Sequence, residues 1–267
     1  MRTRRARRST STACWRSASP PRRPRSAGSV TAVLAAAGSG ERLGAGGPKA
    51  FVPLAGRPMV AWSIAAFRAA PSVHSIVVAC PPGHAHDLGG GDVAVVDGGA
   101  TRAESVSNAL RAVDTELVAI HDAARPLVTP ELIEGAIAAL ASDPEAAGTI
   151  AAAPVTDTVK QVSSADTGAN PALTTQDGAN AGLVVGSTLD RDRLWAAQTP
   201  QVFRVAALRE ALADDPERVA AATDEAMLVE AAGGRVLIHP SSPENLKVTT
   251  PLDLRLAEQL LSERSDQ

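Results

Sequence analysis

Along the chain from residue 30, short apolar stretches alternate with segments that have helical character. Five of the short stretches are rich in valine, isoleucine and alanine and have the length of strands: Val30–Ala36, Ser75–Cys80, Val93–Asp97, Leu117–His121 and Gly148–Ala153. Strands that alternate with helices are typical of a parallel sheet with helices on its faces. The pattern therefore predicts an α/β fold.

Residues with capping preferences mark where several helices begin. Pro58 is expected in a first helical turn. Thr101 and Glu104, three residues apart, have the spacing of a capping box. Thr129–Pro130 predicts an N-cap followed by a first-turn proline, and Thr250–Pro251 repeats this signal before the last helix. Four helix starts are therefore expected from local sequence.

One long polar stretch breaks the alternation. Between Lys160 and Leu189 the chain is rich in Ser, Thr, Asn, Asp and Gly, and the pattern fits neither a helix nor a core strand. We expect an arm or loop that protrudes from the domain over approximately residues 157–190.

Composition limits the classes of protein to which the chain can belong. With 267 residues, 45% of them hydrophobic, it can bury a substantial core, but only 2% are aromatic, so a stacking platform for single-stranded nucleic acid is not expected. The two cysteines, Cys14 and Cys80, are too few for a disulfide or zinc framework. No apolar run approaches the roughly 18 residues that would span a bilayer. We expect a cytoplasmic protein with no membrane or nucleic-acid partner.

The charges are unevenly distributed. Residues 1–29 hold nine Arg and no Asp or Glu, so the rest of the chain combines 17 Lys and Arg with 29 Asp and Glu, a formal charge of −12. A basic, serine-rich N-terminus without acidic residues has three interpretations: a disordered extension, for which a translation start placed too far upstream is one explanation, an organellar transit peptide or a nucleic-acid patch. We expect the disordered extension, followed by one folded domain over residues 30–263.

Polar loops follow the first, third and fourth predicted strands. They are the glycine-rich loop with Arg42 and Lys49, the loop over Asp97–Ser105 and the run His121–Pro126. In an open α/β sheet, ligands bind beyond the carboxyl ends of the strands. The three loops therefore predict a binding site at one edge of the sheet.

The first loop has the composition of a phosphate-binding loop but matches neither familiar type. Leu43 stands where the dinucleotide fingerprint has its third Gly or Ala, which also excludes a nicotinamide dehydrogenase, and Ala50 follows Lys49 where a P-loop has Ser or Thr. Backbone amides in such a loop bind anions, and Arg42 with Lys49 adds two positive charges, which suits a triphosphate. The alternative is a surface turn whose cations are solvated.

The other two loops offer acidic and polar groups. Asp122 directly follows an apolar strand, where a carboxylate can hold Mg²⁺ or a ribose hydroxyl while Arg125 binds anions; alternatively, Asp122 caps a turn and pairs with Arg125. Arg102 and Ser105 either bind a base or phosphate or lie on an exposed helix face. His121 is expected to be a half-buried strand residue.

Six short motifs follow one another along the chain: the glycine loop that ends in Pro-Lys, HDAARP, DTVK, QTPQVF, TDEA and NLKVT. In this order they resemble the 2-C-methyl-D-erythritol 4-phosphate cytidylyltransferase family of the non-mevalonate isoprenoid pathway, over about residues 30–261. The resemblance implies a single Rossmann-like α/β nucleotidyltransferase domain with a mostly parallel twisted sheet and a protruding dimerisation arm. It further implies transfer of CMP from CTP to a small polyol phosphate, with release of pyrophosphate, by a homodimer that uses Mg²⁺.

The resemblance also implies catalytic roles. Arg42 and Lys49 would stabilise the transition state at the α-phosphate, and Arg191 and Lys247 would position the attacking phosphate. Because the attacking group is already an anion, such a reaction needs positioning and charge stabilisation rather than a general base. This requirement agrees with the cations of the motifs.

Matched positions give the binding residues that the resemblance implies. Mg²⁺ would be held mainly by the CTP phosphates, with the Asp122 carboxylate as a protein ligand. The nucleotide would contact Ala36, Ala37, Gly38, Ser39, Gly40, Gly98, Gly99, Ser105, Asp122 and Ala123. The polyol phosphate would lie near Arg125, Thr158 and Thr199.

Three features depart from the family pattern. The arm is longer than usual, Ala100 stands where many relatives have a polar residue, and the basic N-terminus has no counterpart. Two other functions stay open: a cytidylyltransferase that acts on ribitol 5-phosphate, which shares the loop and much of the fold, and a non-catalytic nucleotide-sensing protein. The presence of Arg42, Lys49 and Lys247 disfavours the second.

Overall fold

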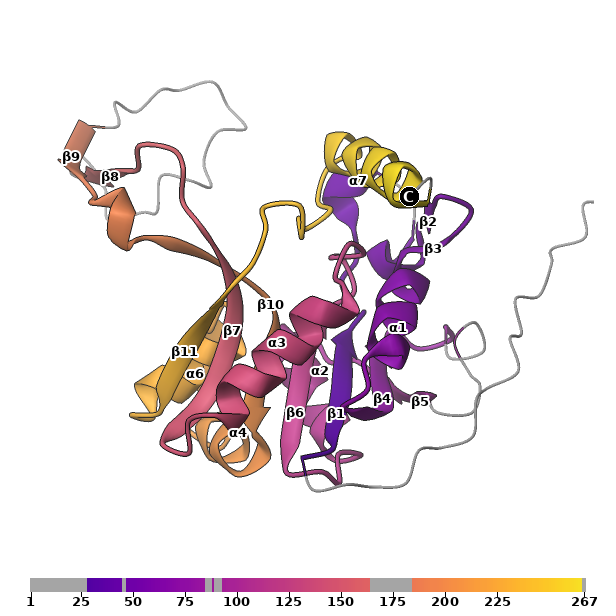
Figure 1. Cartoon of the computed structure of the whole chain (residues 1–267), viewed down its shortest axis with the longest axis horizontal. Helices are drawn as coiled ribbons and strands as arrows, with labels where there is room; N and C mark the ends of the chain where they lie inside the picture. The colour runs from indigo at the N-terminus through magenta and orange to yellow at the C-terminus, as the bar shows by residue number, and fades with distance from the viewer. Residues whose placement is uncertain (1–27, 45–46, 85–87, 89–92, 164–183, 266–267) are drawn as a thin grey trace, which may run out of the picture.

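A central sheet with helices on both faces forms the body of the molecule (Figure 1). The computed structural model describes residues 28–44, 47–84, 88, 93–163 and 184–265, so most of the predicted N-terminal extension lies outside the described residues. The seven strands lie in the order β11-β7-β10-β6-β1-β4-β5. Their bounds are β1 Val30–Ala35, β4 Val73–Cys80, β5 Val93–Asp97, β6 Leu117–Asp122, β7 Ala146–Pro154, β10 Trp195–Arg204 and β11 Arg235–Pro240.

Six of these seven strands run in the same direction. β1 pairs in parallel with β4 and β6, β4 with β5, and β7 with β11, whereas β10 runs antiparallel to both β6 and β7. The five strands predicted from the apolar stretches are all present. The predicted α/β fold with a mostly parallel sheet is therefore confirmed.

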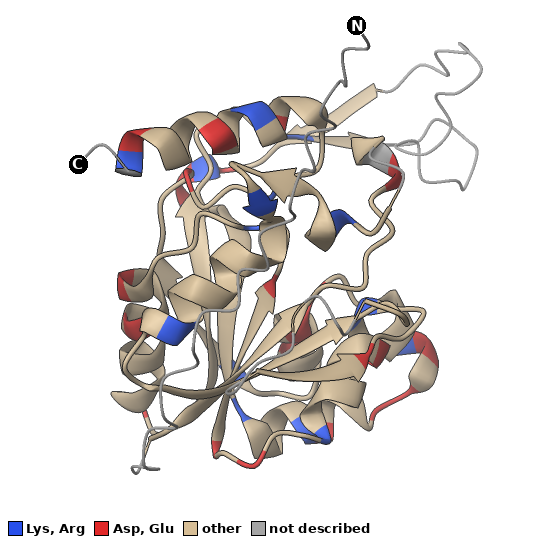
Figure 2. Ribbon diagram, turned by 90° about the vertical axis from the view of Figure 1, so that its right-hand side faces the viewer, with Lys and Arg blue, Asp and Glu red and all other residues tan. Residues whose placement is uncertain are grey.

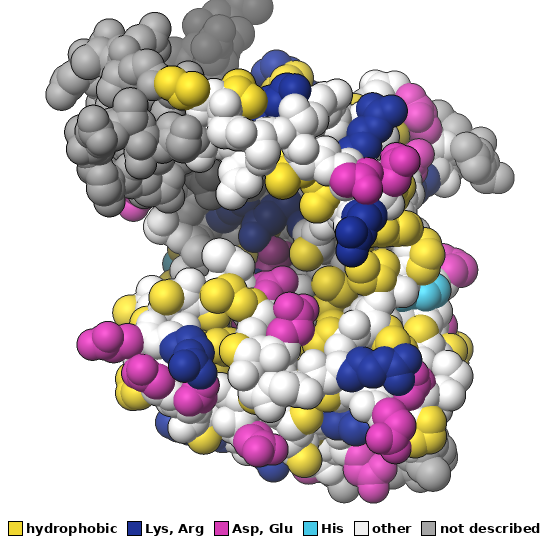
Figure 3. Space-filling model, turned by 90° about the vertical axis from the view of Figure 1, so that its left-hand side faces the viewer, with side chains coloured by type: hydrophobic (Ala, Val, Ile, Leu, Met, Phe, Trp, Pro, Cys, Tyr) yellow, Lys and Arg dark blue, Asp and Glu magenta, His cyan; other side chains and the backbone are white. Residues whose placement is uncertain are grey.

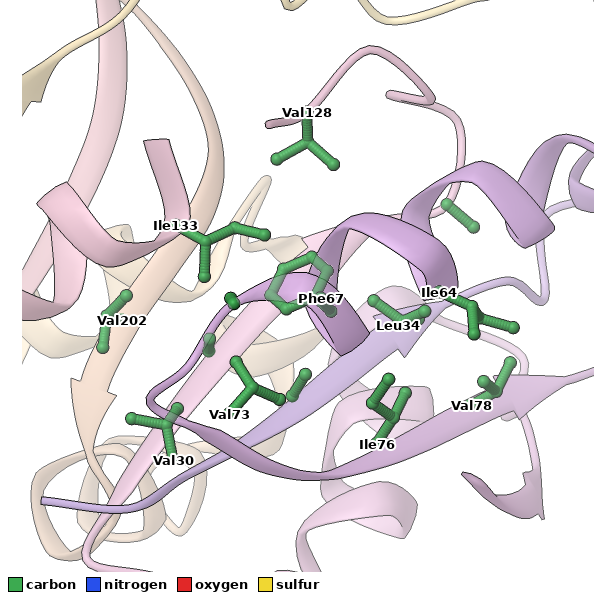
Figure 4. Packing of buried hydrophobic residues seen from close by; sticks show 14 of the residues in the cluster. Val30, Leu34, Ile64, Phe67, Val73, Ile76, Val78, Val128, Ile133 and Val202 are labelled. Atoms are coloured by element: carbon green, nitrogen blue, oxygen red, sulfur yellow. The ribbon is translucent and has the colours of Figure 1, made fainter. Parts of the chain in front are cut away.

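The two faces of the sheet are covered by different helices. One face carries α1 Met59–Ala69 and α3 Pro130–Ala141; the other carries α2 Arg102–Leu110, α4 Val205–Leu212 and α6 Glu225–Ala231, with the short α5 Pro216–Ala221 beside them. Successive strand residues point to opposite faces, so Leu34 packs with Ile64 and Phe67 of α1 (Figure 4), whereas Val33 packs with Val106 of α2. Burial on both faces explains why the parallel strands are continuous apolar runs.

A third apolar cluster closes the end of the sheet where the loops gather. Helix α7, Pro251–Ser265, packs through Ala257 and Leu261 against Leu54 and Leu127. Leu54 belongs to a small hairpin of β2 Pro53–Leu54 and β3 Arg57–Pro58. In the ribbon of Figure 2, charged residues recur along α7. This helix is the support for the chain segment immediately before it, which enters the site described below.

The helix starts follow the local sequence with one exception. The side chains of Thr101, Thr129 and Thr250 each accept a hydrogen bond from the backbone amide three residues later, at 3.1, 3.3 and 3.2 Å. Pro58 was expected inside the first turn of α1, but it is the residue before the helix, which begins at Met59. The expectation was wrong by one residue because Pro58 also ends the β2–β3 hairpin.

The polar stretch begins and ends with two strands outside the main sheet. β8 Lys160–Ser163 and β9 Val184–Thr188 pair antiparallel and project from the body (Figure 1), while residues 164–183 lie outside the described residues. Neither strand belongs to the core. We call residues 157–190 the arm, as predicted from the sequence.

Candidate active site

A cleft with a volume of about 500 Å³ opens at the carboxyl ends of β1 and β6. Its walls come from the glycine-rich loop after β1, the turn after β5 with the start of α2, the loop after β6 and the segment before α7. In Figure 3 a hollow separates the upper and lower parts of the molecule, and basic and acidic side chains meet in it. The lining residues are Ala35–Glu41, Leu43, Lys49, Ala50, Gly99–Arg102, Ser105, Asp122–Ala124, Lys247 and Thr249.

The glycine-rich loop folds back on itself and thereby places Lys49. The amide of Lys49 donates to the carbonyl of Gly38 at 3.1 Å, which closes the loop. Gly40 has a φ of 75°, and a Cβ there would lie 2.9 Å from Cβ of Lys49. A glycine is therefore required at position 40 both for its left-handed backbone and for this close approach.

The turn after β5 packs directly against the glycine-rich loop. A Cβ on Gly98 would lie 2.4 Å from Cβ of Ala37, so the contact between the two loops needs glycine. Ser105 holds the turn: its Oγ accepts from the amide of Gly99 and donates to the carbonyl of Thr101, each at 2.9 Å. Ser105 thus fixes the turn at Gly99–Thr101, which lines the cleft.

Asp122, the last residue of β6, is the centre of a charged row. One carboxylate oxygen accepts a hydrogen bond from Nη1 of Arg102, and the other lies 2.7 Å from Nζ of Lys247. The second terminal nitrogen of Arg102 donates to Oε2 of Glu225 at 2.7 Å. Glu225, Arg102, Asp122 and Lys247 therefore alternate in charge, and the two carboxylate residues are only 1% and 7% exposed.

The row determines the protonation of its members. Burial disfavours the charged form of Asp122, but the positive charges of Arg102 and Lys247 outweigh it and hold the pKa of Asp122 below its ordinary value. Burial raises the pKa of Glu225, and the charge of Arg102 opposes that rise. Burial acts to lower the pKa of Arg102, but the two carboxylates raise it above its ordinary value. Asp122 consequently presents a fixed negative charge to the cleft.

The segment before α7 carries Lys247 and is held at both ends. Nδ2 of Asn245 donates to Oε1 of Gln198 and to the carbonyl of Thr199, both at 2.9 Å, and the amide of Val248 donates to the carbonyl of Ala124 at 2.8 Å. Further on, the Asp253 carboxylate accepts from the side chain and backbone of Thr249, which lowers the pKa of Asp253 to about 2. Lys247 therefore has a fixed backbone although its side chain is 45% exposed.

His121 is a structural residue at the base of the loop after β6. It was expected to be half buried, but it is completely buried, because Phe67 and the sheet enclose its ring. Nδ1 lies 2.9 Å from Oγ1 of Thr199, Nε2 lies 3.2 Å from the carbonyl of Arg125, and Oγ1 of Thr199 also accepts from the amide of Asp122. Burial lowers the pKa of His121 to about 3, so the ring is neutral and does not serve as a cation.

Arg125 takes a different partner from the one that the sequence offered. Its terminal nitrogens donate to the carbonyls of Asn245 and Ala197, at 2.8 and 3.3 Å. The ion-pair partners of Asp122 are Arg102 and Lys247. The alternative in which Asp122 pairs with Arg125 is therefore wrong, and Arg125 instead ties the Lys247 segment to β10.

Most of the residues expected to bind the nucleotide meet in the cleft, together with two of the expected catalytic residues. The lining includes Lys49 and Lys247 from the catalytic set and, from the nucleotide set, Ala36, Ala37, Gly38, Ser39, Gly40, Gly99, Ser105, Asp122 and Ala123. Gly98 lies directly behind this wall. Arg42 lies in the short helix η1, Glu41–Leu43, but its side chain is outside the described part of the structure.

Besides Gly98, four of the expected residues with described side chains do not line the cleft. Arg191 lies in the short helix η5, Arg191–Arg193, where its guanidinium donates to the carbonyl of Thr156 at 2.9 Å. Thr158 is exposed at the base of the arm. Arg125 and the buried Thr199 lie beneath the cleft and hold its floor. Arg191 and Thr158 thus both lie at the base of the arm.

Sequence reasoning gave no site role to Glu225 and Thr249, and for Arg102 it left an exposed helix face open. Arg102 is the bridge between Asp122 and Glu225, and Thr249 lines the cleft beside Lys247. The signal for Glu225 was the motif TDEA, which served the resemblance but was not assigned chemistry. A carboxylate at the start of a helix is common, so only its burial reveals that it needs a cation.

The described residues contain no cluster of three or more His, Cys, Asp or Glu side chains able to hold a metal ion by themselves. Asp122 supplies a single carboxylate in the cleft, and both of its oxygens have cationic partners. This donor set fits a divalent cation that arrives with the phosphates of a substrate, because Mg²⁺ is commonly bound by one carboxylate plus substrate phosphates.

Nowhere in the described ranges is a helix both long and apolar enough to cross a membrane. This finding concerns helices alone.

Comparison with known proteins agrees with the geometry. Residues 30–263 match the family model described as 2-C-methyl-D-erythritol 4-phosphate cytidylyltransferase. Proteins of that name are 41% identical in Symbiobacterium thermophilum, over 89% of this chain and 95% of the relative, and 45% identical in Frankia casuarinae, over 87% and 81%.

Solved structures lead to the same family. The Thermus thermophilus 2-C-methyl-D-erythritol 4-phosphate cytidylyltransferase superposes with a TM-score of 0.69 at 32% identity, covering 88% of this chain and 99% of that one. The Francisella tularensis protein of the same name gives 0.70 at 30% identity, with coverage of 86% and 99%. Family model, relatives and structures each cover most of the chain, and the chain belongs to the 2-C-methyl-D-erythritol 4-phosphate cytidylyltransferase family.

Proposed function

We propose that this chain transfers CMP from CTP to 2-C-methyl-D-erythritol 4-phosphate and releases pyrophosphate, an activity that supplies isoprenoid precursors. The observation that carries the proposal is the cleft in which a glycine-rich loop, Lys49, Asp122 and Lys247 come together. Family membership gives the substrates, and the cleft has the charges that they require. A phosphate oxygen of the polyol phosphate attacks the α-phosphorus of CTP. The bond from that phosphorus to the oxygen that bridges the α- and β-phosphates breaks, and this oxygen leaves with pyrophosphate.

The nucleophile in this reaction is already an anion, so the protein has no proton to remove before attack. The neutral, buried His121 agrees with this, since it is occupied by Thr199 and Arg125 and lies beneath the cleft. Catalysis then consists of holding two phosphates in line and stabilising the negative charge that moves to the leaving pyrophosphate.

The glycine-rich loop and Lys49 form the triphosphate side of the proposed site. Residues 36–40 line the cleft, and the backbone of such a glycine-rich loop suits phosphate oxygens, with Lys49 held beside it through the bond of its amide to Gly38. We assign Lys49, with Arg42, to the charge that develops at the α-phosphate. The turn at Gly98–Gly99 and Ser105 lie next to this loop and suit the nucleoside.

Lys247 forms the side of the attacking phosphate. Its side chain is 45% exposed and one of its contacts is Asp122, so the ammonium group can contact a substrate without leaving the row of charges. Asp122, with phosphate oxygens of CTP, would hold the divalent cation, which we propose is Mg²⁺. When bound, this cation would neutralise phosphate charge.

The arm supports a homodimer in which Arg191 and Thr158 serve the site of the partner. Neither residue lines the cleft of its own chain, and the arm and its base expose large apolar side chains that a second copy of the chain would cover. These side chains are Val162, Val184, Val185, Leu189 and Trp195, between 37% and 57% exposed.

The reaction itself is tested by pyrophosphate release from purified protein with CTP and Mg²⁺. We expect turnover with 2-C-methyl-D-erythritol 4-phosphate. Lys49→Ala should lower kcat by roughly 100-fold or more, because it removes a charge that acts in the transition state. Lys247→Ala should mainly raise KM for the polyol phosphate. Arg218→Ala, which removes one partner of the exposed ion pair with Asp214, should behave as wild type.

Two results of this assay contradict the proposal. Turnover with ribitol 5-phosphate alone would show that the substrate is wrong, and no pyrophosphate with either acceptor would refute the activity. Normal kcat in Lys49→Ala would refute its role while leaving the reaction intact.

The nucleotide side is tested by CTP affinity in Gly98→Ala. A Cβ there would lie 2.4 Å from Cβ of Ala37, so the two loops should separate and CTP binding should weaken about tenfold or more by calorimetry. Gly47→Ala is the matched control, because its Cβ meets no atom within 4 Å. Equal affinities for the two variants would disprove the role of the loop contact.

The shared site is tested by mixing two inactive variants, Arg191→Ala and Lys49→Ala. If Arg191 serves the partner's cleft, each mixed dimer has one intact site, and exchange of subunits should restore about a quarter of wild-type activity, because half of the dimers are mixed. Light scattering on the mixture checks the dimer. Mixed dimers that recover no activity would refute the assignment.

A further inference from the structure

One carboxylate of the charged row lies outside the cleft. Glu225 is 1% exposed, does not line the cleft, and bonds through Oε2 to the second terminal nitrogen of Arg102 at 2.7 Å. An acidic side chain is seldom fully buried unless it is paired. The buried Glu225 either stabilises the fold of α6 or fixes the arrangement of the charged row.

The fold of α6 has other supports. Asp224 caps the helix by accepting from the amide of Met227 at 3.0 Å, and Nε2 of Gln201 fixes that cap at 2.8 Å. Leu228 and Val229 bury the helix in the core. A buried ion pair by itself contributes little net stability, since desolvation offsets the attraction. The helix start therefore does not explain the ion pair of Glu225 with Arg102.

With the described residues, the Arg102 guanidinium forms hydrogen bonds only through its two terminal nitrogens. One terminal nitrogen bonds Asp122, the other bonds Glu225, and the buried Nε has no hydrogen-bond partner in the described part of the chain. Glu225 thus decides how the guanidinium is turned. With Glu225 in place, Arg102 reaches one oxygen of Asp122, and the other oxygen is bonded to Lys247.

We propose that Glu225 is a positioning residue for Lys247: it holds the far end of Arg102, so that Arg102 occupies a single oxygen of Asp122 and Lys247 keeps the other. Without the Glu225 charge, the freed guanidinium can turn and pair with both oxygens of Asp122, the bidentate arrangement that Arg and carboxylates favour. Lys247 then loses its partner. The consequence for catalysis rests on the proposed function, in which Lys247 holds the attacking phosphate.

Lys247 can be observed without reference to the reaction. The chain has three lysines, Lys49, Lys160 and Lys247, so reductive ¹³C-methylation gives three lysine signals in an NMR spectrum, assigned by Lys→Arg variants. We expect Glu225→Gln to move the Lys247 signal toward its position in Asp122→Asn, and to leave the signal of Lys160, which bonds Thr188 on the arm, unchanged. A Lys247 signal that moves in Asp122→Asn but not in Glu225→Gln would overturn the proposal.

Kinetics provides the second readout. Glu225→Gln should raise KM for the polyol phosphate about tenfold, with KM for CTP within about threefold, and it should cause no further loss in a Lys247→Ala background, because residues that act through one another are not additive. Glu225→Asp, which keeps the charge, should recover part of the loss. Glu230→Gln, on the exposed side of α6, is the matched control.

The outcomes separate the two proposals. Fully additive losses with Lys247→Ala, together with equal rises in KM for both substrates, would make Glu225 structural only. If the wild-type protein fails to turn over CTP, the proposed function falls, and the NMR comparison still decides whether Glu225 positions Lys247. Thermal melting of each variant identifies any that does not fold, in which case Glu225→Ala, which also removes the charge, takes the place of Glu225→Gln in the spectrum.

Discussion

The arrangement of this site depends on one buried carboxylate. Asp122 ends the central strand β6 with its two oxygens on opposite cations, Arg102 from α2 and Lys247 from the segment before α7. These residues are far apart in the chain, and the Asp122 carboxylate would be costly to bury without its cations. The attraction is strong because the carboxylate is almost completely buried, and the same burial fixes its charge. A cation for substrate phosphate is thereby held at the end of the sheet.

Around this carboxylate, the close approach of glycine backbones in the loops shapes the cleft. Close packing of Gly98 on Ala37 brings two loops together, and close packing of Gly40 on Lys49 closes the first of these loops. The hydroxyl of Thr199, which is also bonded to the neutral ring of His121, accepts from the amide of Asp122 from below. The result is a polar cleft of fixed dipoles and charges, which suits a reaction governed by phosphate charge rather than by proton transfer.

The sequence predicts the parts that local pattern determines. The apolar strands and three threonine caps are visible because burial on both faces and N-capping act within a few residues. The sequence pattern does not predict β10, because its buried residues Gln198, Thr199 and Gln201 are polar. Hydrogen bonds to neighbouring segments, rather than apolar character, allow them to be buried. The row from Glu225 to Lys247 is likewise invisible, since charge pairing between distant segments leaves no periodicity. The proximity of Lys49 and Asp122 followed from the rule that loops gather at the strand ends.

The measurement that tests this account most directly is kcat/KM of Asp122→Asn. The control is Asp214→Asn, which removes the charge of one partner of the exposed ion pair with Arg218. The amide keeps the shape of the carboxylate but leaves Arg102 and Lys247 without its charge. Loss of one preorganised electrostatic contact in an active site commonly lowers the rate by about 100-fold or more, so kcat/KM should fall by roughly 100-fold or more while the protein stays folded. A folded Asp122→Asn enzyme that works within a few-fold of wild type would contradict the central place given to this carboxylate.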